Sequence, residues 1–325
     1  RRFTIGKYPI WTASAAREKA KGLRRLIDQG IDPLEERNTR REAPTVGDLW
    51  LEYEKVHFPT LSSRSQTDQR GMWANCILPA LQNTAVCDLG SRQIDSLHVK
   101  ITENTPTRAN RVLEVLRKAL NLAIRWGWIE KNPAIGFRRN KEHSRERYLT
   151  VVEYELVFDT LNRMPNQKAA NAIRLLTFTG ARRGEVLGLE WMDINFDLGI
   201  WTIPEHKNKS RKRKRLPISD KAVLLLRAME TKQNSAFVFP TSNGTAMTDI
   251  NKPWKWLRKE TGLTDLRIHD LRHSFASMLV SSGETLETIG KLLGHSQYQT
   301  TMRYAHLMDD PLRRAVTKFS EEVSK

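Results

Sequence analysis

The chain has 325 residues, of which 39% are hydrophobic, and this length is enough for two or three domains with buried cores. No apolar run approaches the roughly 18 residues that a membrane-spanning helix needs. Lys and Arg number 54 against 37 Asp and Glu, so the formal net charge of +17 indicates a polyanionic partner, with nucleic acid ahead of an anionic membrane surface.

The cysteine content and the N-terminal sequence indicate the cellular compartment in which the chain is expected. Two cysteines, Cys76 and Cys87, are too few for a disulfide framework or a zinc cluster, and they are typical of a reducing cytoplasm. The sequence has no signal peptide, lipidation motif or amphipathic membrane anchor. Because it begins at Arg1 rather than at a methionine, we expect a fragment or a processed form.

Residues 1–43 form a small N-terminal unit. The apolar pattern predicts a helix from Ala13 to Ile27, which Gly30 and Pro33 end. The unit is mildly cationic. Its charge fits an appendage that contacts DNA, and it fits a solvated helix at the edge of a domain equally well.

Residues 44–137 predict a domain made of helices alone. We expect its helices to begin at Thr45 with a capping-box-like start, and to lie near 64–75, near 91–101 and from Thr107 to Trp126. The last of these is the clearest, because its apolar residues share one face. Gly127 breaks it, and Asn132-Pro133 ends the domain.

Residues 138–147 are polar and strongly basic, which is typical of an interdomain linker. A basic linker between two basic domains fits a clamp that closes around duplex DNA. Most charged segments of this kind are simply solvated linkers, and composition alone does not separate the two interpretations.

Residues 148–325 predict a mostly helical domain with one small antiparallel sheet. Ile200–Ile203 is rich in β-branched and aromatic residues, and Arg215–Ile218 is expected to return beside it after a lysine-rich turn. The predicted fold class is therefore mainly α, with several domains.

This last domain also carries the residues suited to phosphate chemistry. In Thr179–Glu185 a glycine turn leads into a helix start, so backbone N–H groups and the Arg182 guanidinium are available to a phosphate. His269 and Arg272 stand three residues apart, which places them on one face of a helix. Taken singly, each of these signals also fits ordinary surface or core residues.

A zinc site is a second interpretation of the histidines, because His269 and His273 stand four residues apart. The metalloprotease pattern needs Glu beside the first histidine, but Asp270 follows His269 here. Arg272 would place a guanidinium between the two ligands and oppose a bound cation. We therefore expect no metal.

Tyr304 is the predicted nucleophile. A phenol has an ordinary pKa of about 10, so at neutral pH it attacks only if a base takes its proton or cations stabilise its oxyanion. Histidine can do the first and arginine the second.

Together these motifs resemble those of the tyrosine recombinases, the phage integrase family. The matching segments are the Thr-Gly-x-Arg-x-x-Glu box at 179–185, the His-x-x-Arg box at 269–272, and Leu-Gly-His at 293–295 with Tyr304 nine residues on. Residues 1–43, including Gly30-Ile31-Asp32-Pro33, resemble part of the arm-type domain of prophage and genomic-island integrases. The resemblance implies a SAM-like helical core-binding domain at 44–137 and a catalytic domain at 148–325.

The resemblance also implies roles for single residues. Arg182 and Arg272 would hold the non-bridging oxygens of the scissile phosphate, and His295 would donate a third hydrogen bond to it. Tyr304 would attack to give a 3′-phosphotyrosyl link, and its proton would pass to His269. Glu185 would orient the pocket.

The family's general acid is a lysine on the β-hairpin turn, and here two residues qualify. We favour Lys207 over Lys209, because the segment from Ile203 to Asn208 fits the preceding strand register better. Neither a metal nor another cofactor is expected, since positioning and cationic groups suffice for phosphoryl transfer.

The implied function is a site-specific recombinase, which integrates or excises a mobile element at DNA attachment sites. Its expected partners are duplex DNA, other copies of the chain in a synaptic tetramer that exchange a helix over Pro311–Val323, and DNA-bending or directionality proteins. A type IB-like topoisomerase and a catalytically silent DNA-binding regulator are the alternatives.

Overall fold

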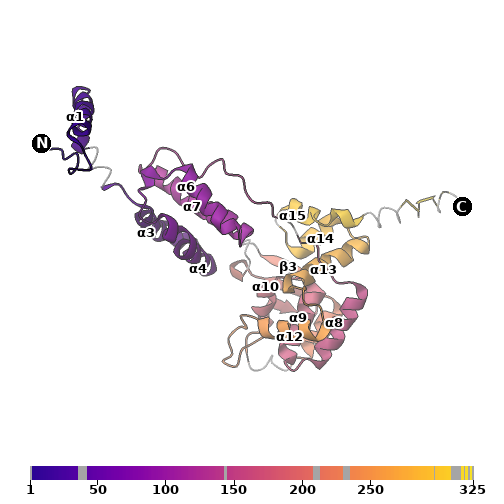
Figure 1. Cartoon of the computed structure of the whole chain (residues 1–325). Helices are drawn as coiled ribbons and strands as arrows, with labels where there is room; N and C mark the ends of the chain where they lie inside the picture. The colour runs from indigo at the N-terminus through magenta and orange to yellow at the C-terminus, as the bar shows by residue number, and fades with distance from the viewer. Residues whose placement is uncertain are drawn as a thin grey trace. The chain divides into compact units, whose positions relative to one another are not determined.

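The computed structural model describes residues 2–35, 42–142, 145–207, 213–229, 235–295 and 297–308, together with positions 316, 317, 319, 320 and 323. The chain divides into two compact units, Arg1–Ser144 and Arg145–Lys325 (Figure 1). Among the described helices, none is both long enough and apolar enough to cross a membrane.

The regular elements in the described part of the first unit are helices. Its α-helices are α1 (Ala13–Asp28), α3 (Val46–His57), α4 (Ser63–Met72), α5 (Leu78–Leu81), α6 (Ser91–Thr102) and α7 (Pro106–Arg125). These bounds confirm the helices expected at 13–27, from 45, near 64–75, near 91–101 and at 107–126. A π-helical turn, Trp73–Ile77, follows α4 and was not expected.

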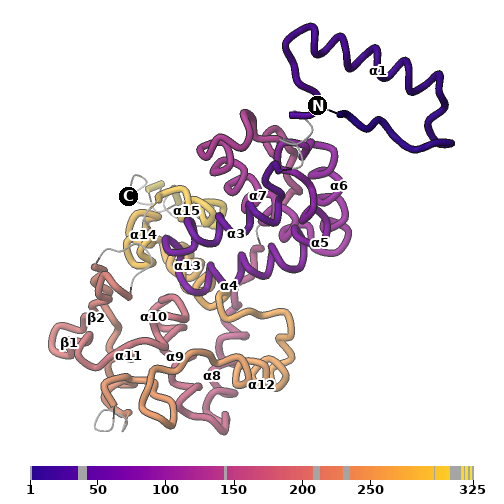
Figure 2. Tube along the Cα trace, turned by 90° about the vertical axis from the view of Figure 1, so that its left-hand side faces the viewer, coloured from indigo at the N-terminus to yellow at the C-terminus, as the bar shows by residue number. Residues whose placement is uncertain are grey.

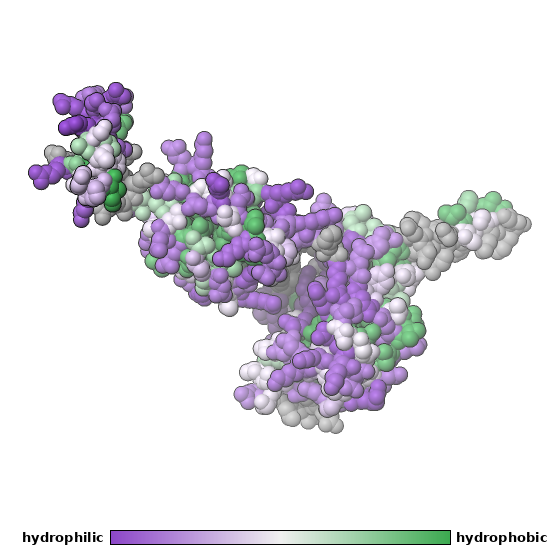
Figure 3. Space-filling model, viewed as in Figure 1, coloured by the Kyte–Doolittle hydropathy of each residue, from purple (hydrophilic) through white to green (hydrophobic). Residues whose placement is uncertain are grey.

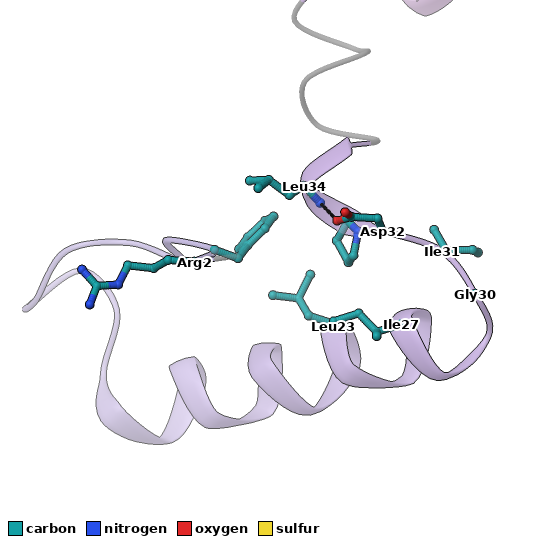
Figure 4. Close-up of a pocket in the computed structure, with 9 residues that line it drawn as sticks. Arg2, Leu23, Ile27, Gly30, Ile31, Asp32 and Leu34 are labelled. Atoms are coloured by element: carbon teal, nitrogen blue, oxygen red, sulfur yellow. Dashed lines mark hydrogen bonds between the residues drawn. The ribbon is translucent and has the colours of Figure 1, made fainter.

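Helix α1 begins after Thr12, whose hydroxyl accepts a hydrogen bond from the Ala15 N–H at 3.3 Å. None of its residues is buried. Leu23 and Ile27 of α1 face Phe3 and the segment Gly30–Leu34 across a mostly apolar hollow (Figure 4). Asp32 shapes that segment by accepting a hydrogen bond from the Leu34 N–H at 2.9 Å. The Gly30-Ile31-Asp32-Pro33 motif therefore forms the turn that leads the chain back past its helix.

The core of the first unit forms where α3, α6 and α7 meet the π-helical turn. Thr45 and Asp48 make the expected capping box, with the Thr45 N–H donating to Asp48 Oδ2 at 2.8 Å and the Asp48 N–H to Thr45 Oγ1 at 3.2 Å. Trp73 is fully buried, and its ring centroid lies 5.1 Å from that of Trp50 and 5.7 Å from that of Tyr53.

Two buried amides join α7 to the segments that follow it. Asn132 donates to the Arg117 carbonyl at 3.0 Å and to Asn121 Oδ1 at 2.6 Å, and it accepts from the Ala134 N–H at 2.8 Å. Asn110 donates to the Asn140 carbonyl at 3.0 Å. Each buried amide therefore has partners, as the cost of desolvating it requires.

The second unit combines helices with a small sheet. Its α-helices are α8 (Val151–Arg163), α9 (Gln167–Thr179), α10 (Arg183–Leu187), α11 (Asp220–Arg227), α12 (Asn251–Thr261), α13 (Ile268–Ser281), α14 (Leu286–Leu293) and α15 (Tyr298–Met302). Its strands are β1 (Ile194–Asn195), β2 (Ile200–Ile203) and β3 (Lys214–Pro217), antiparallel in the order β1-β2-β3. The predicted mainly α fold with a small antiparallel sheet is confirmed.

The hairpin register matters for the site. Ile200 pairs with Pro217 and Ile203 with Lys214, so β3 begins one residue earlier than the sequence predicted. The apolar Leu216 and Trp201 face the core, and Lys214 lies on the same buried side of β3 as Leu216.

Helix α9 is the centre of the second unit. It packs against α8, α10, α11 and α13 (Figure 2). Its apolar residues Ala169, Ile173, Leu175 and Leu176 are buried. Arg182 follows the end of α9, and His269 and Arg272 lie in the first turns of α13. His295 follows α14, and Tyr304 follows α15.

Candidate active site

The turn between α9 and α10 requires glycine. Gly180 has a φ of 60°, and a Cβ built on it would lie 2.4 Å from a ring carbon of Phe275. Arg182 follows as the N-cap of α10. Its N–H donates to Glu185 Oε2 at 2.9 Å and its Nη1 to Glu185 Oε1 at 2.8 Å. Glu185 is buried, and these two bonds fix the position of Arg182 beside it.

Arg272 joins two chain segments beneath the site. Its Nη1 donates to the Gly180 carbonyl at 2.8 Å, and its Nη2 donates to the Leu293 carbonyl at 2.6 Å. Only 4% of Arg272 is exposed. Burial and the charge of Arg182 lower the pKa of Arg272 to about 10, which still leaves it a cation at neutral pH.

His295 follows the C-terminal end of α14. Its Nδ1 lies 2.8 Å from the hydroxyl of the buried Thr301. When that hydroxyl donates to Nδ1, the ring proton is on Nε2, which is then the donor available to a ligand. Burial, followed by the charges of Arg272 and Arg182, lowers the pKa of His295 to about 4, so the ring is neutral at pH 7.

Lys214 is a buried cation that the sequence did not single out. Its Nζ donates to the Leu293 carbonyl at 3.2 Å, so this oxygen accepts from both Lys214 and Arg272. Gly294 gives the lysine room, because a Cβ there would lie 2.8 Å from the Lys214 side chain. Burial lowers the pKa of Lys214 to about 8, although the nearby Glu185 carboxylate acts in the opposite direction.

Tyr304 is 5% exposed, and its hydroxyl lies 2.6 Å from Nδ1 of His273. His269, one helical turn before His273, places its ring edge-on to the second histidine, with centroids 4.8 Å apart. Burial raises the pKa of Tyr304, whereas Arg303 and Arg272 act to lower it. In the sequence, His273 was singled out only as a possible metal ligand. Its position four residues after His269, on the same helix face, was the feature that could have pointed to a contact with Tyr304.

Lys207 lies in a short 3-10 helix, Glu205–Lys207, after β2. Its Nζ is 2.8 Å from a Glu190 carboxylate oxygen and 2.7 Å from one of Asp193. Burial lowers the pKa of Lys207, but these two carboxylates outweigh it and raise the pKa overall. Lys207 and Glu185 line one small hollow. The alternative, Lys209, lies outside the described residues.

The site is therefore a cluster of mutually repelling groups. The charge of Arg182 lowers the pKa of Arg272, and the charges of Arg272 and Arg182 lower the pKa values of Lys214 and His295. Glu185 is the buried carboxylate that balances them. Such an arrangement favours an anionic ligand, because a phosphate would relieve the repulsion that burial amplifies.

Solved structures of DNA-bound integrases share this fold. A Tn1549 transposon integrase in complex with circular-intermediate DNA superposes with a TM-score of 0.72 at 18% identity, over 84% of this chain and 99% of that one. A lambda integrase tetramer bound to a Holliday junction gives a TM-score of 0.70 at 18% identity, over 91% of this chain and 90% of that one.

The chain belongs to the phage integrase family. The family model matches residues 147–310, and a model of an arm DNA-binding domain matches residues 1–40. A curated relative is the prophage integrase IntZ of Escherichia coli K12, 26% identical over 247 residues. That match covers 73% of this chain and 61% of the relative.

Proposed function

We propose that the chain is a site-specific DNA recombinase that cleaves and rejoins duplex DNA through a 3′-phosphotyrosyl intermediate. The observation that carries this proposal is the buried Tyr304 phenol, 2.6 Å from an imidazole and within the electrostatic influence of Arg272 and Arg303. A nucleophile, a neutral base and cations are the groups that in-line attack on a phosphodiester needs.

Each residue then has one task. Arg182 and Arg272 bind the non-bridging oxygens of the scissile phosphate, and the neutral His295 donates from Nε2 to the same group. Tyr304 attacks phosphorus, and its proton passes to the histidines of α13, for which the sequence favours His269. The cations supply charge stabilisation in a site already shaped for it.

The leaving 5′ oxygen needs a proton, which we assign to a lysine between β2 and β3. Lys207 is the first choice, and it would have to leave Glu190 and Asp193 to reach the DNA. A duplex with sulfur in place of the 5′ bridging oxygen separates Lys207 from Lys209, since a thiolate leaves without a general acid. Lys207→Ala and Lys209→Ala are compared on this duplex. If Lys207 is the general acid, the sulfur should restore cleavage by Lys207→Ala. If it restores cleavage by Lys209→Ala alone, Lys209 is the general acid.

Covalent capture tests the function itself. The unaltered chain and Tyr304→Phe are incubated in EDTA with fragmented genomic DNA of the source organism, and adducts that survive SDS are sequenced. Adducts from the unaltered chain alone, converging on one sequence, are the expected result. Adducts scattered over the genome would favour a topoisomerase, and their absence would favour a DNA-binding regulator.

We further propose that copies of the chain assemble on DNA by exchanging their C-terminal segments. Most of Pro311–Val323 lies outside the described residues, but its Val316, Phe319 and Val323 are exposed apolar side chains at helical spacing. The second unit offers an apolar groove on α8, α9 and α13, and Figure 3 shows apolar surface over α8. The groove is lined by Tyr154, Phe158, Phe178, Phe275, Met278 and Leu279.

Deleting the residues after Leu307 tests this exchange. Loss of the multimeric complex on DNA, with binding of a single copy retained, is expected, because the groove would lose its occupant. Unchanged assembly in a native gel-shift assay would contradict it. We also propose that DNA-bending or directionality proteins act together with the chain when it integrates or excises a mobile element.

A further inference from the structure

We propose that His273 is a further residue of the site: it holds the Tyr304 phenol in place and is the first acceptor of its proton. This inference rests on the proposed recombinase function and adds a residue to it. It starts from the hydrogen bond between His273 Nδ1 and Tyr304 Oη, at 2.6 Å.

The direction of this bond follows from acidity. A phenol O–H is a stronger acid than the N–H of a neutral imidazole, so the phenol donates and Nδ1 accepts. His273 must then carry its own proton on Nε2. A distance of 2.6 Å is short even for a hydrogen bond donated by a hydroxyl, and short bonds of this kind are those along which a proton moves most readily.

The surroundings keep His273 neutral. Burial is the largest effect that lowers its pKa, to about 4, and His269, Arg303, Arg272 and His295 act in the same direction. An uncharged imidazole is the form that can receive a proton. The negative phosphate of bound DNA would oppose these cations and raise the affinity of His273 for the proton at the moment of attack.

The proposed step balances as follows. The phenol transfers its proton to His273 Nδ1 while its oxygen forms a bond to phosphorus. The bond from phosphorus to the 5′ oxygen breaks, and that oxygen takes the electron pair together with a proton from the hairpin lysine. His273 is left as an imidazolium, and it returns the proton to Tyr304 when a 5′-hydroxyl attacks the phosphotyrosyl link.

His269 is the neighbour from which this role must be distinguished. It lies one turn earlier on α13, and among the described contacts its ring meets that of His273 edge-on, while the Tyr304 hydroxyl donates its hydrogen bond to His273. His269 is therefore placed to influence the imidazolium after proton transfer, and His273, whose Nδ1 accepts the hydrogen bond from the phenol, is placed to receive the proton.

The first experiment needs no DNA. Tyrosine labelled with ¹³C at Cζ is incorporated, and the Tyr304 signal is assigned by its loss in Tyr304→Phe. We expect His273→Ala to shift this signal, because the phenol loses its acceptor, and His269→Ala to leave it in place. An unchanged Tyr304 signal in His273→Ala would overturn the proposal, whatever the function of the chain.

The second experiment measures the rate of SDS-stable adduct formation on the DNA that the unaltered chain attacks. Removing a general base costs about 10²–10⁴-fold, so we expect a loss of this size in His273→Ala and partial recovery when imidazole is added to the buffer. His273→Asn keeps an acceptor oxygen near the position of Nδ1 but cannot take a proton, and should remain slow.

A purely structural role gives different results. His273→Asn would then react at nearly the rate of the unaltered chain, imidazole would have no effect on His273→Ala, and the proposal would be wrong. If the unaltered chain itself forms no adduct, the proposed function fails, and the NMR measurement still decides whether His273 holds the phenol.

Discussion

The two units of the chain bury polar groups of different kinds. In the described part of the first unit the buried polar side chains are the amides of Asn110 and Asn132. In the second unit they include four ionisable groups, Glu185, Lys214, Asp270 and Arg272. Both units have well-formed apolar cores, so this difference does not reflect a weaker core in either.

The difference separates stability from function. A hydrogen-bonded amide joins chain segments at little electrostatic cost, whereas several like charges in one buried site oppose folding. Lys214 and Arg272 share the Leu293 carbonyl, and the charge of Arg272 adds to burial in lowering the pKa of Lys214. A chain keeps such an arrangement where an anionic ligand makes use of it.

Among the changes that test this difference between the two units, Arg272→Lys should have the largest effect. The single ammonium of lysine cannot donate to both the Gly180 and Leu293 carbonyls and also form two parallel hydrogen bonds to a phosphate, as a guanidinium can. We expect adduct formation to slow by about 10²–10³-fold, measured in single turnover. The matched control is Arg174→Lys on α9, where the guanidinium bonds Asn162 and Asn171 instead. An equal loss in this control would show that the slower reaction is not specific to Arg272, and it would contradict the prediction.

Asn132→Ala should show the opposite behaviour. The change leaves the Arg117 carbonyl and the Ala134 N–H without their partner, so the free energy of unfolding of the first unit should fall by about 1–3 kcal/mol in urea. Adduct formation at saturating DNA should be unchanged. Asn104→Ala, at an exposed position, is the control, and a loss of reactivity in Asn132→Ala would break the proposed division between the units.

The smallest expected effect is on acid stability. His273 and His295 have folded pKa values of about 4, chiefly because of burial, against an ordinary value of 6.5. The unfolded state therefore binds more protons between these values, and the stability of the second unit is lost as pH falls from about 6.5 towards 4. Hydrogen exchange at pH 7 and pH 5 should show a smaller loss in His295→Gln than in the unaltered chain. Equal losses would contradict this sign.

Local patterns in the sequence were enough to predict most of the fold. The apolar face of α7, the Thr45–Asp48 cap and the β-branched strand β2 are each decided within a few residues. The π-helical turn after α4 could not be predicted in this way, because it depends on the burial of Trp73 among Trp50 and Tyr53. Tertiary packing overrides propensity there.

The site shows the same limit. The spacings of Arg182, His269, Arg272, His295 and Tyr304 match a family pattern, which is why the sequence assigns them to one site. The contacts of Lys214 and His273 could not be predicted, because they span 79 and 31 residues of sequence, to the Leu293 carbonyl and the Tyr304 hydroxyl. Lys214 also stands in a stretch of sequence rich in lysine and arginine, where composition does not single it out.

The β2–β3 pairing has a consequence for how this chain can change in length. Lys214 is fixed opposite Ile203 by backbone pairing, whereas Lys207 lies in the connection between the two strands. Insertions or deletions in that connection would shift its lysines and leave Lys214 where it is. The connection can therefore change in length without disturbing Lys214, the cation that holds the end of α14 through the Leu293 carbonyl.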